Sequence, residues 1–140
     1  MHLEKEFDVR QTREAATAIA GRDETLISLF PEAETEIVAR DGNRRTAASH
    51  YTALGRSGTA TFHFTTLDDG DLEFEKVCDG NVWRELKGRL SFHERGEGTR
   101  VRLTLDGRTK PLIPEFTIKG TMSDQIEEMA TALRERLERE

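Results

Sequence analysis

The sequence predicts an α+β fold made of seven antiparallel strands, two short helices after the first strand, and a long C-terminal helix. Turn signals rich in Gly, Asn and Asp divide the middle of the chain, at residues 41–43, 55–58, 68–71, 79–81 and 95–98. These residue types supply the positive φ angles that tight hairpins need. The runs between them are rich in Thr, Val and Phe and partly alternate apolar with polar residues, which is typical of strands.

The six strands after the first are expected to form a meander, because only a turn separates each of them from the next. The opening strand, from Leu3 to Val9, alternates apolar and charged residues. Six more strands are expected near residues 33–41, 44–54, 59–67, 72–78, 82–93 and 99–107. This spacing of strand and turn predicts an antiparallel sheet.

Two segments carry helical patterns instead. Residues 12–30 are rich in Ala, Leu and Ile, with Thr12 as a suitable N-cap and Pro31 as the end of the segment. The Gly21-Arg22-Asp23 sequence divides it into two short helices.

The C-terminal segment has the stronger helical period. Small and apolar residues recur there at steps of three and four, which predicts one helix face toward the sheet; they are Leu112, Phe116, Gly120, Ser123, Ile126, Ala130, Leu133 and Leu137. Pro111 and Pro114 suit a first helical turn. An internal glycine costs about 1 kcal/mol relative to alanine, so a helix start near Thr121 is the alternative.

Length and charge exclude several classes of protein. The chain has 140 residues, the size of one domain, and we expect a single domain over residues 1–140. It carries 21 Lys and Arg against 27 Asp and Glu, a net charge of −6, which gives no general attraction to nucleic acid or to anionic membranes. The longest apolar stretch, Leu26 to Phe30, is far shorter than the ~20 residues of a membrane span. The charged start has no signal-peptide core. The sequence therefore predicts a cytoplasmic protein without membrane insertion or a nucleic-acid partner.

No motif in the sequence predicts a metal or a cofactor. The single cysteine, Cys78, excludes an internal disulfide and a cysteine-rich zinc site. His50 and His63 are expected to face each other on the outer side of the sheet, but zinc needs three or four ligands. Nucleophile and phosphate-loop motifs are absent from the sequence.

The order of elements and three local sequences carry a family resemblance. These are Phe7-Asp8-Val9 before the first helix, Leu29-Phe30-Pro31 leading into Glu36-Ile37-Val38, and residues 98–103 before the long helix. On them the chain resembles the START-like (SRPBCC) helix-grip superfamily, and most of all its polyketide cyclase/dehydrase members and its members related to a subunit of carbon monoxide dehydrogenase. The resemblance covers essentially the whole chain. It implies a curved sheet wrapped around the C-terminal helix, with a cavity between them that usually holds an apolar or amphipathic small molecule.

Hairpin registers predict which side chains face that cavity. A turn centred on Arg56 and Ser57 pairs Tyr51 with Phe62, so that Tyr51, Phe62 and Phe64 share the inner face. Three-residue loops at the next two hairpins put further inner residues opposite one another: Leu72, Phe74 and Lys76 against Gly88, Leu86 and Arg84. Leu90 then pairs with Leu103, and the only tryptophan, Trp83, is expected to point outward.

Three inner positions carry no side chain or only a small polar one, where a protein core normally has apolar side chains. Gly88 lies in mid-strand, and Gly120 and Ser123 lie on the inner side of the helix. Either a ligand occupies this gap, or Gly88 marks a bulge and Gly120 lets Phe74 or Leu86 approach closely. Lys76 and Arg84 are like charges on opposed positions. They either receive an anionic ligand group or extend past the sheet edge into water.

Three functions remain open at this point. The first is a binder of a small hydrophobic or amphipathic molecule, either lipid-like or polyketide-like. The second is a cyclase/dehydrase-like enzyme in which Tyr51, Lys76 or Arg84 polarises a carbonyl. The third is a noncatalytic accessory subunit with a filled core, and a homodimer through the outer face or an edge strand is also left open. The candidate ligand-binding residues are Tyr51, Phe62, Phe64, Phe74, Lys76, Arg84, Leu86, Gly88, Leu90, Phe116, Gly120 and Ser123.

Overall fold

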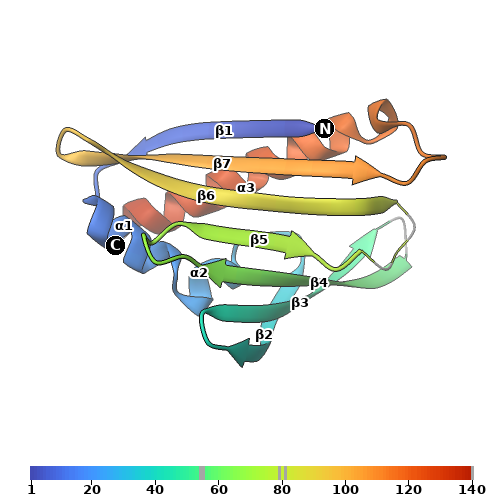
Figure 1. Cartoon of the computed structure of the whole chain (residues 1–140), viewed down its shortest axis with the longest axis horizontal. Coiled ribbons are helices and arrows are strands. Elements are labelled where there is room, and N and C mark those ends of the chain that lie inside the picture. Colours follow the sequence, from blue (N-terminus) through green and yellow to red (C-terminus); the bar gives the residue numbers. More distant parts are fainter. Residues whose placement is uncertain (54–55, 79, 81, 140) are drawn as a thin grey trace.

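Seven strands form one antiparallel sheet in the computed structural model, which describes residues 1–53, 56–78, 80 and 82–139 (Figure 1). The strand order is β1-β7-β6-β5-β4-β3-β2, so every strand from β2 to β7 pairs with its neighbour in sequence and β1 pairs with β7. The strands are β1 (His2–Val9), β2 (Glu34–Asp41), β3 (Arg44–Ala53), β4 (Arg56–Thr66), β5 (Leu72–Lys76), β6 (Trp83–Arg95) and β7 (Gly98–Thr109). The predicted seven-stranded antiparallel sheet, with its last six strands as a meander, is confirmed.

The helices lie where the sequence patterns placed them, except for the start of the last one. They are α1 (Arg13–Ala20), α2 (Asp23–Ile27), the short 3-10 helix η1 (Glu115–Thr117) and α3 (Lys119–Arg139). Thr12 caps α1, because its hydroxyl oxygen accepts a hydrogen bond from the Ala15 amide at 3.2 Å. The helix α3 begins near the Thr121 alternative and not at the prolines, since the chain before it forms η1.

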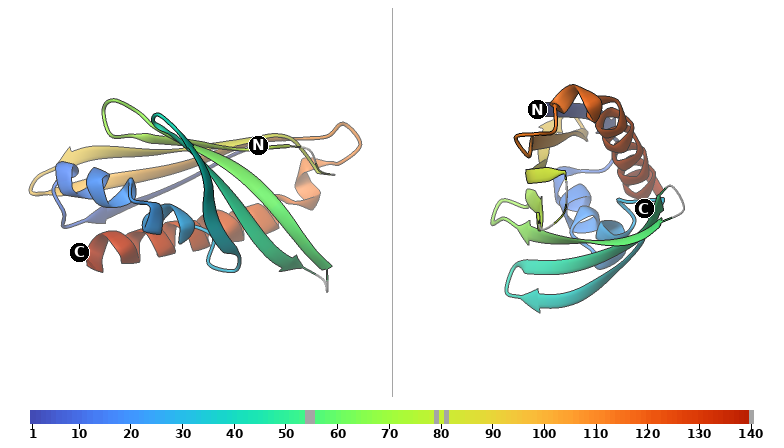
Figure 2. Two further views of the ribbon diagram at one scale, coloured as in Figure 1. Left: turned by 90° about the horizontal axis from the view of Figure 1, so that it is seen from below. Right: turned by 90° about the vertical axis from the view of Figure 1, so that its right-hand side faces the viewer.

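The sheet curls around α3, which runs along its concave face, while α1 and α2 lie at one end (Figure 2). Inner residues of the strands and one face of α3 make the core. On β7 every second residue is buried, from Thr99 to Gly107, as the period of two requires. From α3 the core takes Met122, Ile126, Met129, Ala130, Leu133 and Leu137.

The predicted registers are correct at one side of the sheet and shifted at the other. Leu90 pairs with Leu103, as expected. Tyr51 pairs with Gly58 and not with Phe62, a shift of four residues, because Ala53 already pairs with Arg56. The connecting residues 54 and 55, and the turn residues Asp79 and Asn81, lie outside the described residues. Between β5 and β6 the shift is two residues, since Phe74 pairs with Gly88. Both shifts are even, so the inner residues stay on the inner face.

An irregularity at the start of β6 reverses two predicted orientations. The pairing of β6 with β7 is shifted between Trp83 and Glu85, and such a bulge redirects side chains locally. Trp83 therefore points inward and is only 8% exposed, whereas Arg84 is exposed. The predictions of an outward Trp83 and an inward Arg84 are wrong.

Aromatic rings occupy the space over two glycines on the inner face. A Cβ atom on Gly88 would collide with the ring of Phe74, its cross-strand partner, and one on Gly107 would collide with the ring of Trp83. Gly88 thus neither leaves a gap for a ligand nor marks a bulge, because the register shift in β6 lies at Trp83 and Glu85. It lets an aromatic side chain lie directly against the strand.

The substitution Gly88→Ala is expected to lower the free energy of unfolding by about 1–3 kcal/mol, because the new methyl group displaces the Phe74 ring in a packed core. The matched control is Gly120→Ala. Gly120 lies in the first turns of α3 with open space around its Cβ position, so alanine should raise stability by up to about 1 kcal/mol. Urea denaturation measures both changes, and equal effects at the two positions would contradict the packing argument.

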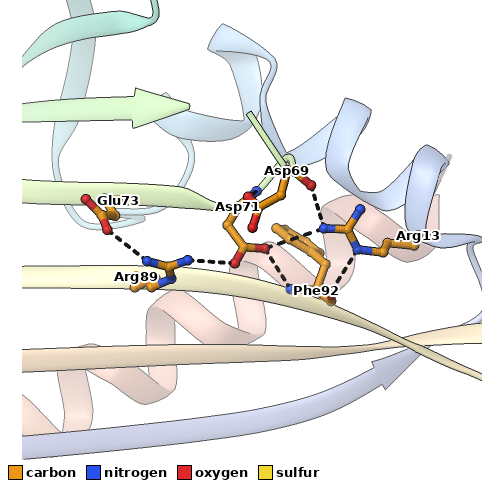
Figure 3. A network of polar contacts seen from close by, with 6 residues as sticks. All are labelled: Arg13, Asp69, Asp71, Glu73, Arg89 and Phe92. Carbon is orange, nitrogen blue, oxygen red and sulfur yellow. Dashed lines mark hydrogen bonds and ion pairs between the residues drawn. The ribbon is translucent and has the colours of Figure 1, made fainter. Parts of the chain in front are cut away.

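A buried carboxylate fixes α1 to the strands β5 and β6 (Figure 3). Asp71 is 7% exposed; it accepts hydrogen bonds from the Phe92 amide at 3.2 Å and from Arg89 at 3.0 Å. Arg13 of α1 donates to the Phe92 carbonyl at 2.9 Å and lies 3.8 Å from the Asp71 carboxylate. A buried charge is tolerable when it is paired in this way, and the network holds the helix layer against one end of the sheet.

Candidate functional site

A pocket of about 370 Å3, here called the inner pocket, lies between the sheet and the first half of α3. Strands β3 to β7 form its floor, and the segment that follows α2 closes one side. It lies on the inner side of the sheet against α3, but the residues expected to leave a gap there, Gly88, Gly120 and Ser123, do not line it. The lining residues divide into an apolar wall and a polar rim.

Half of the residues in the apolar wall are aromatic. The wall consists of Phe30, Phe62, Phe74, Trp83, Leu86, Leu105, Met122 and Met129. Phe30 stacks on Phe62 with ring centroids 4.6 Å apart. Below them Phe64 lies 6.4 Å from Phe62 and 5.8 Å from Phe74, distances typical of favourable aromatic pairs. The phenylalanine rings of the wall are therefore supported by the core ring of Phe64.

The polar rim combines one cation with two carboxylates. Lys76 is half-buried and lines the pocket with Gln125, Glu32 and Glu128. Among the residues that the structure describes, Lys76 has no ion-pair partner. The rim thus offers hydrogen-bonding and charged groups beside an apolar wall, as sites for small molecules commonly do.

The two glutamates of the rim interact with each other. Partial burial raises the pKa of Glu128 above its usual value, and the negative charges of Glu32 and Asp124 and a hydrogen bond with Glu32 raise it further. The folded protein therefore holds this proton more tightly than the unfolded chain does. Between the unfolded and the folded pKa, stability must fall as the pH rises.

Removing the charge of Glu128 is expected to stabilise the protein at neutral pH. Glu128→Gln keeps the hydrogen-bonding capacity but ends the repulsion with Glu32 and Asp124. The gain over the parent should be present at pH 7 and should vanish below about pH 4.5, where the parent is protonated too. Urea denaturation across this pH range measures it. Glu135→Gln, an exposed change on the same helix, should stay within about 0.5 kcal/mol, and a gain equal to that control would refute the interpretation.

Five of the predicted ligand-binding residues line the inner pocket: Tyr51, Phe62, Phe74, Lys76 and Leu86. Tyr51 does so from the pocket's edge, with its ring over Gly58 and with 43% of its surface exposed. Phe64 and Leu90 are buried in the core beneath the lining. Gly88 lies against the Phe74 ring.

The other four predicted residues point away from the pocket. Arg84, Phe116, Gly120 and Ser123 are exposed, Phe116 by 80%. The predicted helix face took its phase from Leu112 and Phe116, but these residues precede α3. The true inner face begins at Met122, so its neighbours Gly120 and Ser123 turn to solvent. The paired cationic mouth of Lys76 and Arg84 is wrong, and only Lys76 is present at the rim.

The two histidines do not pair with each other across the strands, so this prediction is wrong. His50 pairs with Thr59, and its Nδ1 lies 3.1 Å from the Thr59 hydroxyl. His63 pairs with Thr46, with Nδ1 2.9 Å from that hydroxyl. Across the described part of the chain, no three His, Cys, Asp or Glu side chains gather as metal ligands.

Sequence reasoning missed Trp83, Met122, Met129, Gln125 and Glu128 as lining residues. The residues Met122, Ile126, Met129 and Leu133 recur at steps of four, three and four, and this signal places the inner face of α3 correctly. The inward turn of Trp83 depends on the irregularity in β6, for which the sequence carries no signal that we recognise.

Comparison with known proteins identifies the fold. No model of a protein family matches the chain, and no curated protein matches it. Solved structures do. The protein TTHA0849 of Thermus thermophilus is 25% identical with a TM-score of 0.77, and the match covers 98% of this chain and 97% of the other. A START superfamily protein of Mycobacterium smegmatis is 22% identical with a TM-score of 0.77, over 99% and 97%.

The Zhui aromatase/cyclase of Streptomyces sp. R1128 is 15% identical with a TM-score of 0.76, over 98% of this chain and 90% of the other. No described helix is long and apolar enough to cross a membrane. The element order, the sheet curled around α3 and these matches agree over the length of the chain. The protein has the START-like, or helix-grip, fold.

Proposed function

We propose that the protein binds a small hydrophobic or amphipathic molecule in the inner pocket. The observation that carries the proposal is the pocket itself, about 370 Å3 of space between the apolar wall and the first half of α3. Pockets that hold small molecules commonly measure ~300–1,000 Å3.

The composition of the lining supports an amphipathic ligand. The wall offers aromatic and aliphatic carbon to an apolar body, and Lys76, Gln125 and Glu128 lie at its rim to meet a polar group. The START superfamily and aromatase/cyclase names of the similar structures fit a lipid-like or polyketide-like molecule. A chain with a single cysteine cannot form an internal disulfide and therefore does not need an oxidising compartment. We propose that binding takes place in the cytoplasm.

Native mass spectrometry of the freshly purified protein tests the proposal. We expect an adduct that dissociates on denaturation, and extraction should identify its chemical class. Where the protein purifies empty, thermal-shift measurements across fatty acids, sterols and aromatic polyketides should raise the melting temperature for at least one class. A bare protein whose melting temperature no compound raises would contradict ligand binding and favour the accessory-subunit alternative.

A further inference from the structure

The connection between β7 and α3 displays two large apolar side chains to solvent. Leu112 is 96% exposed and Phe116 is 80% exposed. The other large exposed apolar side chains among the described residues are Val38 and Tyr51. Val38 belongs to β2 and Tyr51 lines the inner pocket, so neither is part of this connection. Exposed apolar side chains that gather in one place indicate an interaction surface.

The backbone of this connection is held in place. The Thr109 hydroxyl donates to the Ile113 carbonyl at 2.6 Å, and the Ile113 amide donates to the Lys110 carbonyl at 2.9 Å. The Lys110 amide donates to the Val82 carbonyl at 2.9 Å, which fixes the connection to the chain before β6. Ile118 packs against the core. The connection therefore packs the half-buried Ile118 against the core and presents Leu112 and Phe116 outward.

The charges within the connection itself are mostly positive. Residues 108–119 contain three exposed cations, Arg108, Lys110 and Lys119, and one carboxylate, Glu115. With three cations and one carboxylate, the segment carries a net charge of +2. The described residues provide no ion-pair partner for Arg108, Lys110 or Lys119. This local excess contrasts with the net charge of −6 of the whole chain.

We infer that this end of the molecule, with Leu112 and Phe116 among exposed cations, is a docking surface for an anionic lipid bilayer. Apolar side chains flanked by Lys and Arg are suited to the interface of such a membrane, where the carbon enters the headgroup region and the cations meet the lipid charges. The contact is peripheral and needs no spanning segment.

The docking surface lies beside the inner pocket. Thr121 and Met122 in the first turn of α3 line the pocket, and so does Trp83, next to the Val82 carbonyl that holds the connection. Docking would therefore bring the pocket to the membrane surface. The inference goes beyond the proposed function and does not depend on it, because the exposed groups lie outside the pocket.

Vesicle flotation tests the inference, with the full chain and vesicles of phosphatidylcholine alone or mixed with phosphatidylglycerol. We expect binding to the mixed vesicles at low salt and little binding to phosphatidylcholine. The double variant Leu112→Ser with Phe116→Ser should weaken binding at least tenfold. Arg108→Gln with Lys119→Gln should weaken it roughly 25-fold, about fivefold for each cation.

The matched controls change an exposed apolar side chain and two exposed cations that lie outside this connection. Val38→Ser removes an exposed apolar side chain of β2 (54% exposed). Arg44→Gln with Arg95→Gln removes two exposed cations from the hairpins at the other end. Both controls should bind like the parent. Absence of flotation with the mixed vesicles, or an equal loss in the controls, would overturn the inference.

Two further readouts separate this inference from its alternatives. Thermal midpoints of all variants should match the parent, since every changed side chain is exposed. If the parent self-associates in size-exclusion chromatography through Leu112 and Phe116 and ignores vesicles, the surface binds a second copy and the inference is wrong. An adduct in native mass spectrometry without vesicle binding would likewise contradict the docking surface, but it would support the proposed function of the pocket.

Discussion

Replacing Ala60 with phenylalanine is expected to abolish ligand binding while the fold persists. Ala60 of β4 pairs with Ser49 and lines the inner pocket. A phenyl ring at this position takes volume that the ligand needs, and side chains and ligand cannot share close-packed space. The affinity should drop by roughly 100-fold or more, about 3 kcal/mol. Titration with the molecule identified by native mass spectrometry measures the loss.

The matched control is Ala48→Phe on the neighbouring strand. Ala48 pairs with Thr61 and alternates with the buried Ala47 and Ser49, so it points to the outer face. The control should bind the ligand as tightly as the parent. Equal affinity of Ala60→Phe and the parent would show that the ligand, if any, binds elsewhere.

Truncating Phe64 to alanine is expected to have the largest effect on stability. Phe64 is fully buried beneath the inner pocket, with its ring near those of Phe62 and Phe74. Removing a buried ring loses its transfer free energy and leaves a cavity. Together these two effects lower the free energy of unfolding by about 3–5 kcal/mol. Urea denaturation followed by circular dichroism should show this loss.

Phe116→Ala provides the comparison for that measurement. Its side chain is 80% exposed, so the free energy of unfolding should change by no more than about 0.5 kcal/mol. A loss below about 1 kcal/mol at Phe64 would contradict the packing of the aromatic layer under the pocket.

The sequence predicted the strands and their inner faces for a simple physical reason. Side chains alternate along a strand with a period of two, so the registers of β3–β4 and β5–β6 could slip by four and two residues without turning Phe62 or Phe74 outward. The absolute pairing depends on loop length, which composition alone does not determine. Hence Tyr51 has Gly58 as its partner, where Phe62 was expected.

The predictions of site residues are wrong where a helix or strand period does not continue through an irregular segment. A helical period that includes Leu112 and Phe116 predicts the wrong phase for α3, because the chain between 113 and 118 is not α-helical. Gly120 and Ser123 are therefore exposed, and Met122 and Met129 line the inner pocket. Similarly, the irregularity in β6 exchanged the sides of Trp83 and Arg84.

The fluorescence of Trp83 tests the central claim most directly. It is the only tryptophan of the chain, it lies in the wall of the inner pocket, and it is 8% exposed. Titration with the identified ligand, or with the fatty acid, sterol and polyketide panel, should change its emission saturably with one molecule bound per chain. The change should disappear in Ala60→Phe and persist in Ala48→Phe. Constant emission across the panel, or the same response in both variants, would contradict a ligand site between the sheet and α3.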